Sequence, residues 1–185
     1  MSTGNLLEVR NLKVWFPIRR FLREALFVRA VDDVSFDLRR GETLAIVGES
    51  GSGKTTLGKT CLKLIEPTSG SIIYDGRDIT SISNKDLGWY RREAQIIYQD
   101  PFSSLNPFFT VYKTLEEPLI VNKVEGDRSE LIYKALEDVK LIPVEEFIGK
   151  YPHMLSGGQR QRVAIARALI LKPRFVVADE PVSML

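Results

Sequence analysis

Residues 48–55 constrain the fold of this chain more than any other segment. They read Gly-Glu-Ser-Gly-Ser-Gly-Lys-Thr and fit the pattern G-x-x-x-x-G-K-[ST]. The run Thr43–Val47 before them has the length and β-branched content of a buried strand. The residues after them keep helical spacing on one face: Leu57, Cys61, Leu64 and Ile65. The predicted unit is therefore a strand, a glycine loop and a helix.

A loop of this kind binds phosphate groups. Its glycines let backbone N–H groups point inward, and the helix start adds its positive end. Lys54 would reach the β and γ phosphates, and the Thr55 hydroxyl would coordinate Mg²⁺. We expect these nucleotide-binding residues: Gly48, Ser50, Gly51, Ser52, Gly53, Lys54, Thr55 and Thr56. The alternative is a glycine turn with an exposed lysine. GTPases, small-molecule kinases and helicases share the loop, so it does not identify the NTPase.

Two carboxylates follow an apolar run near the end of the sequence. Phe175–Ala178 reads as a second buried parallel strand, and Asp179 and Glu180 come next. Parallel sheets present their ligand crevice at the carboxyl ends of the strands. Asp179 would hold Mg²⁺ through its water shell, and Glu180 would accept a proton from an attacking water.

A second glycine-containing segment, Leu155-Ser156-Gly157-Gly158-Gln159, precedes another predicted helix. The apolar face of that helix is formed by Val163, Ala166 and Ile170. Ser156 is placed to cap the helix, and two glycines at its start expose backbone donors to an anion. This second anion site could serve the nucleotide of another molecule. A capped helix with a flexible start explains the same residues equally well.

The rest of the chain supplies further elements. Alternation predicts antiparallel strands over Leu6–Phe16 and Val31–Leu38. Between them, Pro17–Arg29 is interpreted as a solvated connector, with a basic amphipathic helical turn near a membrane as the alternative. Further predictions are strands over Ser71–Tyr74 and Ala94–Tyr98, a helix around Lys85–Arg92, a helical insertion over Val111–Ile148 and a last helix over Gly158–Leu171.

Composition limits the partners. Twenty-six basic and 24 acidic residues give a net charge of +2, so no strong field favours nucleic acid. The single cysteine, Cys61, suits a reducing compartment. No apolar run approaches the roughly 18 to 20 residues that span a bilayer, so we expect any membrane role to depend on a partner.

The order of these motifs resembles one family, the ATPases of ABC transporters. Its elements here are the Walker A loop, Gln99 after a strand, the signature Leu-Ser-Gly-Gly-Gln and the acidic pair. The resemblance implies an α/β fold, with a P-loop NTPase RecA-like core, an antiparallel β subdomain and an inserted helical subdomain. The expected divisions are 1–100, the β subdomain and P-loop core; 101–160, the helical subdomain; and 161–185, the return to the core.

The resemblance also implies roles for single residues. ATP and Mg²⁺ are the expected ligands, with Thr55, Gln99 and Asp179 at the metal. Phe16 resembles the aromatic that stacks on adenine, with Trp15 and Phe27 as alternatives and plain core packing as the competing interpretation. Gln99 would sense Mg²⁺ and the attacking water, and the expected catalytic set is Glu180, Gln99 and Lys54. In a head-to-tail dimer, Ser156 and Gly158 would meet the γ phosphate bound by the other subunit, within the signature Leu155, Ser156, Gly157, Gly158 and Gln159.

Three shorter stretches, residues 99–107, Tyr151–His153 and Ala30–Asp32, are similar to the oligopeptide and dipeptide importer branch. The implied function is ATP hydrolysis that energises peptide import at the cytoplasmic face of the membrane. The implied partners are permease subunits, an identical or paralogous second ATPase and, indirectly, an extracytoplasmic peptide-binding protein, but not nucleic acid. Alternatives are import of nickel, glutathione or antimicrobial peptides, an ABC ATPase of DNA repair or translation, and a regulatory nucleotide sensor.

One departure from the family pattern concerns the end of the sequence. The family continues Ser-x-Leu-Asp after the acidic pair, whereas this sequence stops at Ser183-Met184-Leu185. We therefore expect the aspartate of that loop, the switch histidine and the last strands to be absent. Two consequences are predicted: an exposed, association-prone edge on strand Phe175–Ala178, and slow or absent hydrolysis.

Overall fold

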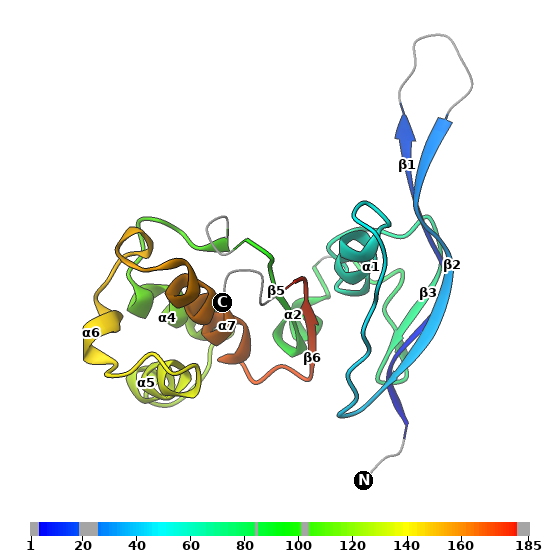
Figure 1. Ribbon diagram of the computed structural model, residues 1–185. Coiled ribbons are helices and arrows are strands. Elements are labelled where there is room, and N and C mark those ends of the chain that lie inside the picture. The colour runs from blue at the N-terminus through cyan, green and yellow to red at the C-terminus, as the bar shows by residue number, and fades with distance from the viewer. Residues whose placement is uncertain (1–3, 19–25, 84, 101–103, 181–185) are drawn as a thin grey trace. The chain divides into compact units, whose positions relative to one another are not determined.

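The structure is a computed structural model that describes residues 4–18, 26–83, 85–100 and 104–180. The chain forms two compact units, Met1–Gly88 and Trp89–Leu185 (Figure 1). Among the helices of the described ranges, none combines the length and the apolar character that crossing a membrane requires.

The first unit is built on an antiparallel sheet. Its strands are β1 (Asn5–Ile18), β2 (Leu26–Arg39), β3 (Ser69–Tyr74) and β4 (Arg77–Asp78), in the order β2-β1-β3-β4. Burial in β1 alternates on either side of a register shift: Leu7 and Val9 are buried before it, and Leu12 and Val14 after it. The period-two pattern thus predicted the existence of both long strands, because one face of the sheet packs on a core, but it predicted them shorter than they are.

The two long strands continue past the rest of their sheet. β3 pairs with β1 from Leu7 to Lys13, and beyond that point β1 pairs with β2 as far as Ile18. The interpretation of Pro17–Arg29 as a connector was therefore wrong at both ends, since Pro17 and Ile18 belong to β1 and Leu26–Arg29 to β2. Residues 19–25 lie outside the described residues.

The glycine loop leads into α1 (Lys54–Cys61), as predicted, but the strand expected before it is not formed. Residues 43–47 are not in a strand and are exposed, with Val47 92% exposed. A parallel strand needs a neighbour for its N–H and C=O groups, and no described strand pairs with this segment. The predicted helix is also too long: α1 ends at Cys61, and Lys63 has a φ of 55°, so Leu64 is exposed.

The second unit contains a short parallel sheet. After α2 (Gly88–Glu93), strand β5 (Ala94–Ile97) pairs in parallel with β6 (Phe175–Ala178). Phe175 is buried, Val176 and Val177 are half-buried and Ala178 is exposed, so β6 is less buried than expected. In the part of the chain that the structure describes, β5 is the one partner of β6. Association through the other edge stays a prediction.

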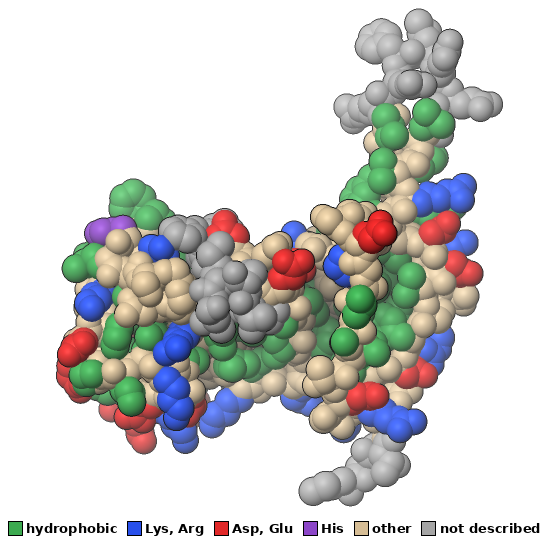
Figure 2. All heavy atoms as spheres, viewed as in Figure 1, with side chains coloured by type: hydrophobic (Ala, Val, Ile, Leu, Met, Phe, Trp, Pro, Cys, Tyr) green, Lys and Arg blue, Asp and Glu red, His purple; other side chains and the backbone are tan. Residues whose placement is uncertain are grey.

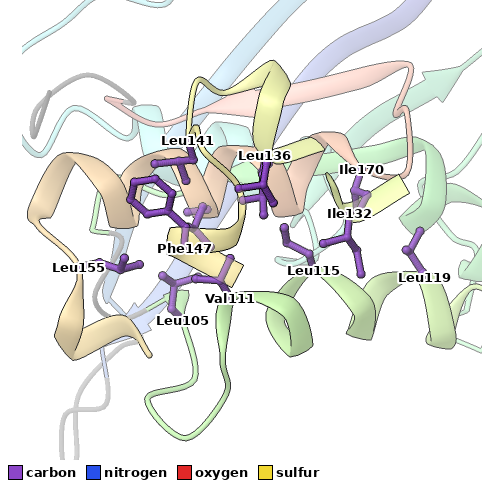
Figure 3. Close-up of a cluster of buried hydrophobic side chains, with 14 residues drawn as sticks. Leu105, Val111, Leu115, Leu119, Ile132, Leu136, Leu141, Phe147, Leu155 and Ile170 are labelled. Carbon is purple, nitrogen blue, oxygen red and sulfur yellow. The ribbon is translucent and has the colours of Figure 1, made fainter. Parts of the chain in front are cut away.

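Helices form the rest of this unit. They are α4 (Val111–Val121), α5 (Arg128–Asp138), α6 (Glu145–Ile148), the 3₁₀ turn η1 (Pro152–Met154) and α7 (Gly157–Leu169). Apolar side chains from these elements meet in one core, as Figure 3 shows for Leu115, Leu136 and Phe147. The helical insertion and the buried face of Val163, Ala166 and Ile170 are confirmed. The core holds α7, and with it the signature segment, against α4 and α5.

Candidate functional site

The glycine loop has the backbone of an anion-binding nest. Gly51 has a φ of 81° and Gly53 a φ of 93°, in the left-handed region that a side chain disfavours. Ser52 N–H donates to the Glu49 carbonyl at 3.2 Å and tightens the turn. Gly53 is the N-cap of α1, and no side chain caps this helix start. The loop therefore turns backbone donors of the first helical turn toward a single region.

Lys54 is held across its own loop. Its Nζ donates to the carbonyl oxygen of Gly48 at 2.8 Å and to that of Glu49 at 2.7 Å. An ammonium group has three N–H donors, so these two contacts leave donor capacity for an anion in the loop. The side chain is half-buried rather than extended into solvent. The arrangement places a fixed positive charge beside the nest.

The loop packs closely against the antiparallel sheet at Ala30. The sequence did not predict this contact. Val14 pairs with Val31 and Trp15 with Arg29, so Ala30 is an extra residue, a β-bulge, in β2. Its carbonyl oxygen lies 1.9 Å from where a Cβ on Gly53 would stand. Only glycine fits at position 53 with this backbone. The motif's third glycine is thus required by a neighbour 23 positions earlier in the sequence as well as by the turn.

The acidic pair follows β6, next to the strand that ends near Gln99. Asp179 N–H donates to the Ile97 carbonyl at 3.0 Å, which continues the parallel ladder past Ala178. Glu180 has a φ of 47°, and its Oε2 accepts a hydrogen bond from Gln99 Nε2 at 2.6 Å. The structure therefore brings together two of the three predicted catalytic residues, 81 positions apart in the sequence.

The signature segment is a helix start of defined geometry. Leu155 is buried in the helical core, whereas Ser156 is exposed. Ser156 Oγ accepts from Gln159 N–H at 3.2 Å, and Gln159 Oε1 accepts from Ser156 N–H at 2.9 Å. These reciprocal bonds form a capping box, which confirms the predicted cap.

The three aromatic candidates differ in how open their rings are. Trp15 is covered by the Arg29 guanidinium, 4.6 Å from its ring centroid, and its Nε1 donates to Asp32 Oδ1 at 3.1 Å. Phe27 lies beside Trp15, with ring centroids 6.1 Å apart. Phe16 is 42% exposed, so plain core packing is wrong for it. Phe27 is 47% exposed, so Phe16 and Phe27 both have more surface available for a flat ligand than Trp15 has.

The predicted residues fall into two groups. Phe16 and the loop from Gly48 to Thr56 belong to the first unit. The residues Gln99, Asp179 and Glu180 and the signature belong to the second. Within the described ranges, no group of three or more His, Cys, Asp or Glu side chains could hold a metal ion. A metal here would need phosphate oxygens as further ligands, as Mg²⁺ commonly does.

A glycine-rich phosphate loop at a helix start, an acidic pair after a parallel strand and a capped second helix on a mixed α/β frame define a phosphate-loop nucleotide-binding protein. The chain belongs to the ABC transporter family, because the family model "ABC transporter" matches residues 31–183. The expected fold class is confirmed by solved structures of cassettes of this kind.

One such structure is a dimeric, post-hydrolysis state of the ATP-binding cassette MJ0796 bound to ADP and Pi. It superposes with a TM-score of 0.85 at 29% identity, covering 97% of this chain and 75% of that one. A second, a dimeric structure of MJ0796 as a bacterial ABC transporter cassette, gives a TM-score of 0.83 at 30% identity over the same shares.

Curated relatives are similar along most of the sequence. The oligopeptide transport ATP-binding protein AppF of Bacillus subtilis is 48% identical over 97% of this chain and 56% of its own length. The dipeptide transport ATP-binding protein DppF of Haemophilus influenzae is 46% identical over 97% of this chain and 55% of its own length. The chain thus spans little more than half the length of the curated relatives it matches.

Proposed function

We propose that this chain is the nucleotide-binding part of an ATPase subunit that energises peptide import by an ABC transporter. The observation that carries the proposal is the loop itself: left-handed Gly51 and Gly53, an uncapped helix start and Lys54 fixed over the loop carbonyls. Identities of 46–48% to oligopeptide and dipeptide transport ATP-binding proteins support the transport role.

ATP is the proposed ligand of the loop. Backbone N–H groups from the loop and the first turn of α1 would donate to phosphate oxygens, and Lys54 would neutralise charge on the β and γ phosphates. The residues proposed for this are Gly48, Ser50, Gly51, Ser52, Gly53, Lys54, Thr55 and Thr56. Phe16 would stack on the adenine. The ADP and Pi bound to the MJ0796 cassette support a nucleotide at this loop.

Mg²⁺ is the proposed metal, with Thr55, Gln99 and Asp179 as its protein ligands. Their hydroxyl, amide and carboxylate oxygens are the hard donors that Mg²⁺ prefers. The set contains a single carboxylate, which suits an ion that also binds phosphate oxygens. When bound, the ion would offset negative charge that develops on the phosphates during hydrolysis.

Glu180 is the proposed general base. Its carboxylate would accept a proton from the attacking water, and Gln99 would orient both that water and the carboxylate. The 2.6 Å hydrogen bond between Gln99 Nε2 and Glu180 Oε2 supports this pairing, because one side chain already fixes the direction of the other. Lys54 would stabilise the negative charge on the transferred phosphate.

A second ATPase subunit is the proposed partner at the signature. Because Ser156 Oγ accepts from Gln159 N–H, its own hydroxyl proton stays available to donate to a phosphate oxygen of the other subunit's ATP. Gly158 N–H would add a second donor. The full set proposed for this contact is Leu155, Ser156, Gly157, Gly158 and Gln159, with Leu155 as a buried anchor. The dimeric state of the MJ0796 cassette supports a dimer, identical or mixed.

Permease subunits are the proposed membrane partners, and a cavity of about 380 Å³ in the second unit suits one of their segments. Its lining includes Ile96 and Ile97 of β5, Pro118 of α4, and Ala164 and Arg167 of α7. A segment seated there would touch both the strand that leads to Gln99 and the helix that starts at the signature. Such contacts would couple nucleotide state to the permease and hold the chain at the cytoplasmic face of the membrane.

Peptides are the proposed cargo, delivered by an extracytoplasmic binding protein that this chain does not touch. Nickel, glutathione or antimicrobial peptides are the alternative cargoes. Copurification would separate transport from a role in DNA repair or translation. An integral membrane partner is expected, and recovery with nucleic acid would contradict the proposal.

Calorimetry of ATP with Mg²⁺ tests the nucleotide site. We expect the chain to bind ATP, and Lys54→Ala to weaken binding at least tenfold. Lys59→Ala removes a charge of the same type from the last turn of the same helix and serves as the matched control. Equal affinity in Lys54→Ala and Lys59→Ala would contradict the proposed role of the loop lysine.

A further inference from the structure

The far ends of β1 and β2 form a two-stranded ribbon that carries the largest group of exposed apolar side chains among the described residues of the first unit. We define the outer ribbon as residues 15–18 of β1 and 26–29 of β2, where each strand pairs with the other (Figure 1). Five of its residues are 42–51% exposed: Phe16, Ile18, Leu26, Phe27 and Val28. A two-stranded ribbon has no second layer to cover such residues, and exposed apolar groups of this size mark interaction surfaces.

Apolar groups occupy both faces of the outer ribbon. Phe16 pairs with Val28 and Ile18 with Leu26, so these four side chains share one face. Pro17 pairs with Phe27, which places Phe27 on the opposite face with Trp15. A protein groove or another strand would cover one face or one edge. A lipid headgroup layer can surround a narrow ribbon from both faces.

Positive charge concentrates in the same stretch of sequence. Residues 13–29 include five basic residues, Lys13, Arg19, Arg20, Arg23 and Arg29, and one acidic residue, Glu24, whereas the whole chain has 26 basic and 24 acidic residues. In the structure, Arg29 and Lys13 lie at the ring of Trp15. Arg29 also faces Asp32 at 3.5 Å, and its side chain remains 62% exposed.

We propose that the outer ribbon binds an anionic membrane surface. Ile18, Leu26 and Phe27 would enter the headgroup region, and Arg29 and Lys13 would face lipid phosphates. Apolar side chains beside basic ones are the combination that binds interfaces peripherally, and each cation near such a surface adds to the attraction. The proposed contact is independent of nucleotide binding and does not use Phe16, so it goes beyond the proposed function.

Cosedimentation with vesicles tests this surface. Vesicles of phosphatidylcholine alone are compared with vesicles that also contain phosphatidylglycerol, at low and at high salt. We expect binding to the anionic vesicles that weakens as salt rises. The ribbon variant is Ile18→Thr with Leu26→Thr, which keeps strand propensity and should lower vesicle binding about tenfold. ATP binding of this variant, measured in parallel, is expected to be unchanged.

The matched control is Ile120→Gln with Leu169→Gln in the second unit. Those side chains are 49% and 44% exposed, against 43% and 48% for Ile18 and Leu26, so a similar apolar area is removed. Vesicle binding of this control is expected to equal that of the unchanged chain. An equal loss of vesicle binding in the control and ribbon variants would overturn the proposal, because non-specific hydrophobic adsorption would then explain the binding.

Tryptophan fluorescence gives a second readout that leaves the ribbon unaltered. The chain has two tryptophans, so Trp89→Phe leaves Trp15 as the single reporter at the ribbon. Anionic vesicles are expected to shift Trp15 emission to shorter wavelength, and uncharged vesicles are not. The proposal would be overturned if anionic vesicles left the Trp15 emission unchanged and the chain did not cosediment with them. Self-association that the ribbon variant abolishes would also overturn it, since that result assigns the surface to a second copy of the chain.

Discussion

The carbonyl oxygen of Ala30 lies 1.9 Å from the point that a Cβ atom on Gly53 would occupy. Ala30 is the bulged residue of β2, and Gly53 is the N-cap of α1. A sheet residue therefore fixes the start of the helix whose first turn closes the phosphate loop. Because of the bulge, Ala30 has no partner residue in β1.

Gly53→Ala is accordingly predicted to disrupt both stability and ATP binding. A methyl group would meet the Ala30 backbone, and the φ of 93° disfavours any side chain. We expect a loss of about 3 kcal/mol in the free energy of unfolding, from overpacking and left-handed strain together. Urea unfolding measures the loss of stability. Calorimetry measures the affinity for ATP, which should fall at least tenfold.

Gly41→Ala separates the two causes in that experiment. Gly41 has a φ of 73° but no heavy atom within 4 Å of its added Cβ, and it lies outside the loop. It should cost only about 1 kcal/mol of stability and leave ATP affinity unchanged. If Gly53→Ala lowers the free energy of unfolding no more than Gly41→Ala does, the close contact with Ala30 does not contribute to the cost of the substitution.

Local signals in the sequence predicted local structure well. The strands β1 and β2 were found because apolar and polar residues alternate in their sequences, and the Ser156 cap was found because a capping serine acts within three residues. The loop glycines were found because a left-handed turn before a helix requires them. In each case the physical cause lies within one element.

Non-local contacts explain what the sequence could not indicate. Thr43–Val47 has strand composition, but a parallel strand depends on neighbours far along the chain, and no described strand pairs with it. The bond between Gln99 and Glu180 joins residues 81 positions apart, and the bulge at Ala30 depends on the register between two strands. Residues 17–18 and 26–29 of the outer ribbon were predicted as a connector because the apolar residues there lack a buried face.

Glu180→Gln is predicted to separate ATP binding from hydrolysis. Glutamine keeps the size of the side chain and an oxygen that can accept from Gln99 Nε2, but it cannot take a proton from water. Phosphate release by the assembled ATPase at saturating ATP should fall about 100-fold or more, with ATP affinity within about twofold of the original. Because the pair is exposed, the urea midpoint should hardly move. A variant that still hydrolyses ATP at the original rate would remove Glu180 from the role of base.

Ser156→Ala is predicted to reduce both stability and ATP turnover. The capping hydroxyl accepts from Gln159 N–H at 3.2 Å, so its loss should cost about 1 kcal/mol. Thr110→Ala removes the cap of α4, which accepts from Lys113 N–H at the same 3.2 Å, and should cost a similar amount. Only Ser156→Ala should also reduce turnover in the assembled ATPase. Equal turnover losses in the two variants would make the signature serine a structural cap and no more.

The thiol of Cys61 is predicted to be inert until the first unit unfolds. Burial raises its pKa to about 12, so the folded protein keeps the neutral thiol and offers little of the reactive thiolate. A disulfide reagent at about pH 8 should therefore label the folded chain far more slowly than the chain in guanidinium. Cys61 is the single cysteine, so the signal has one source. Labelling at the unfolded rate without denaturant would show that the site is open in the folded state.

The same raised pKa sets the sign of a pH dependence. A group whose pKa is higher in the folded state stabilises the fold below its unfolded pKa of roughly 8.5, and that contribution is lost as pH rises toward about 12. The free energy of unfolding should thus fall above about pH 9 more steeply in the original chain than in Cys61→Ala, which has no thiol to ionise. Lysines and tyrosines titrate in both proteins, so the difference between the two pH profiles isolates Cys61. Parallel profiles would mean that the thiol ionises as easily in the folded chain as in the unfolded one.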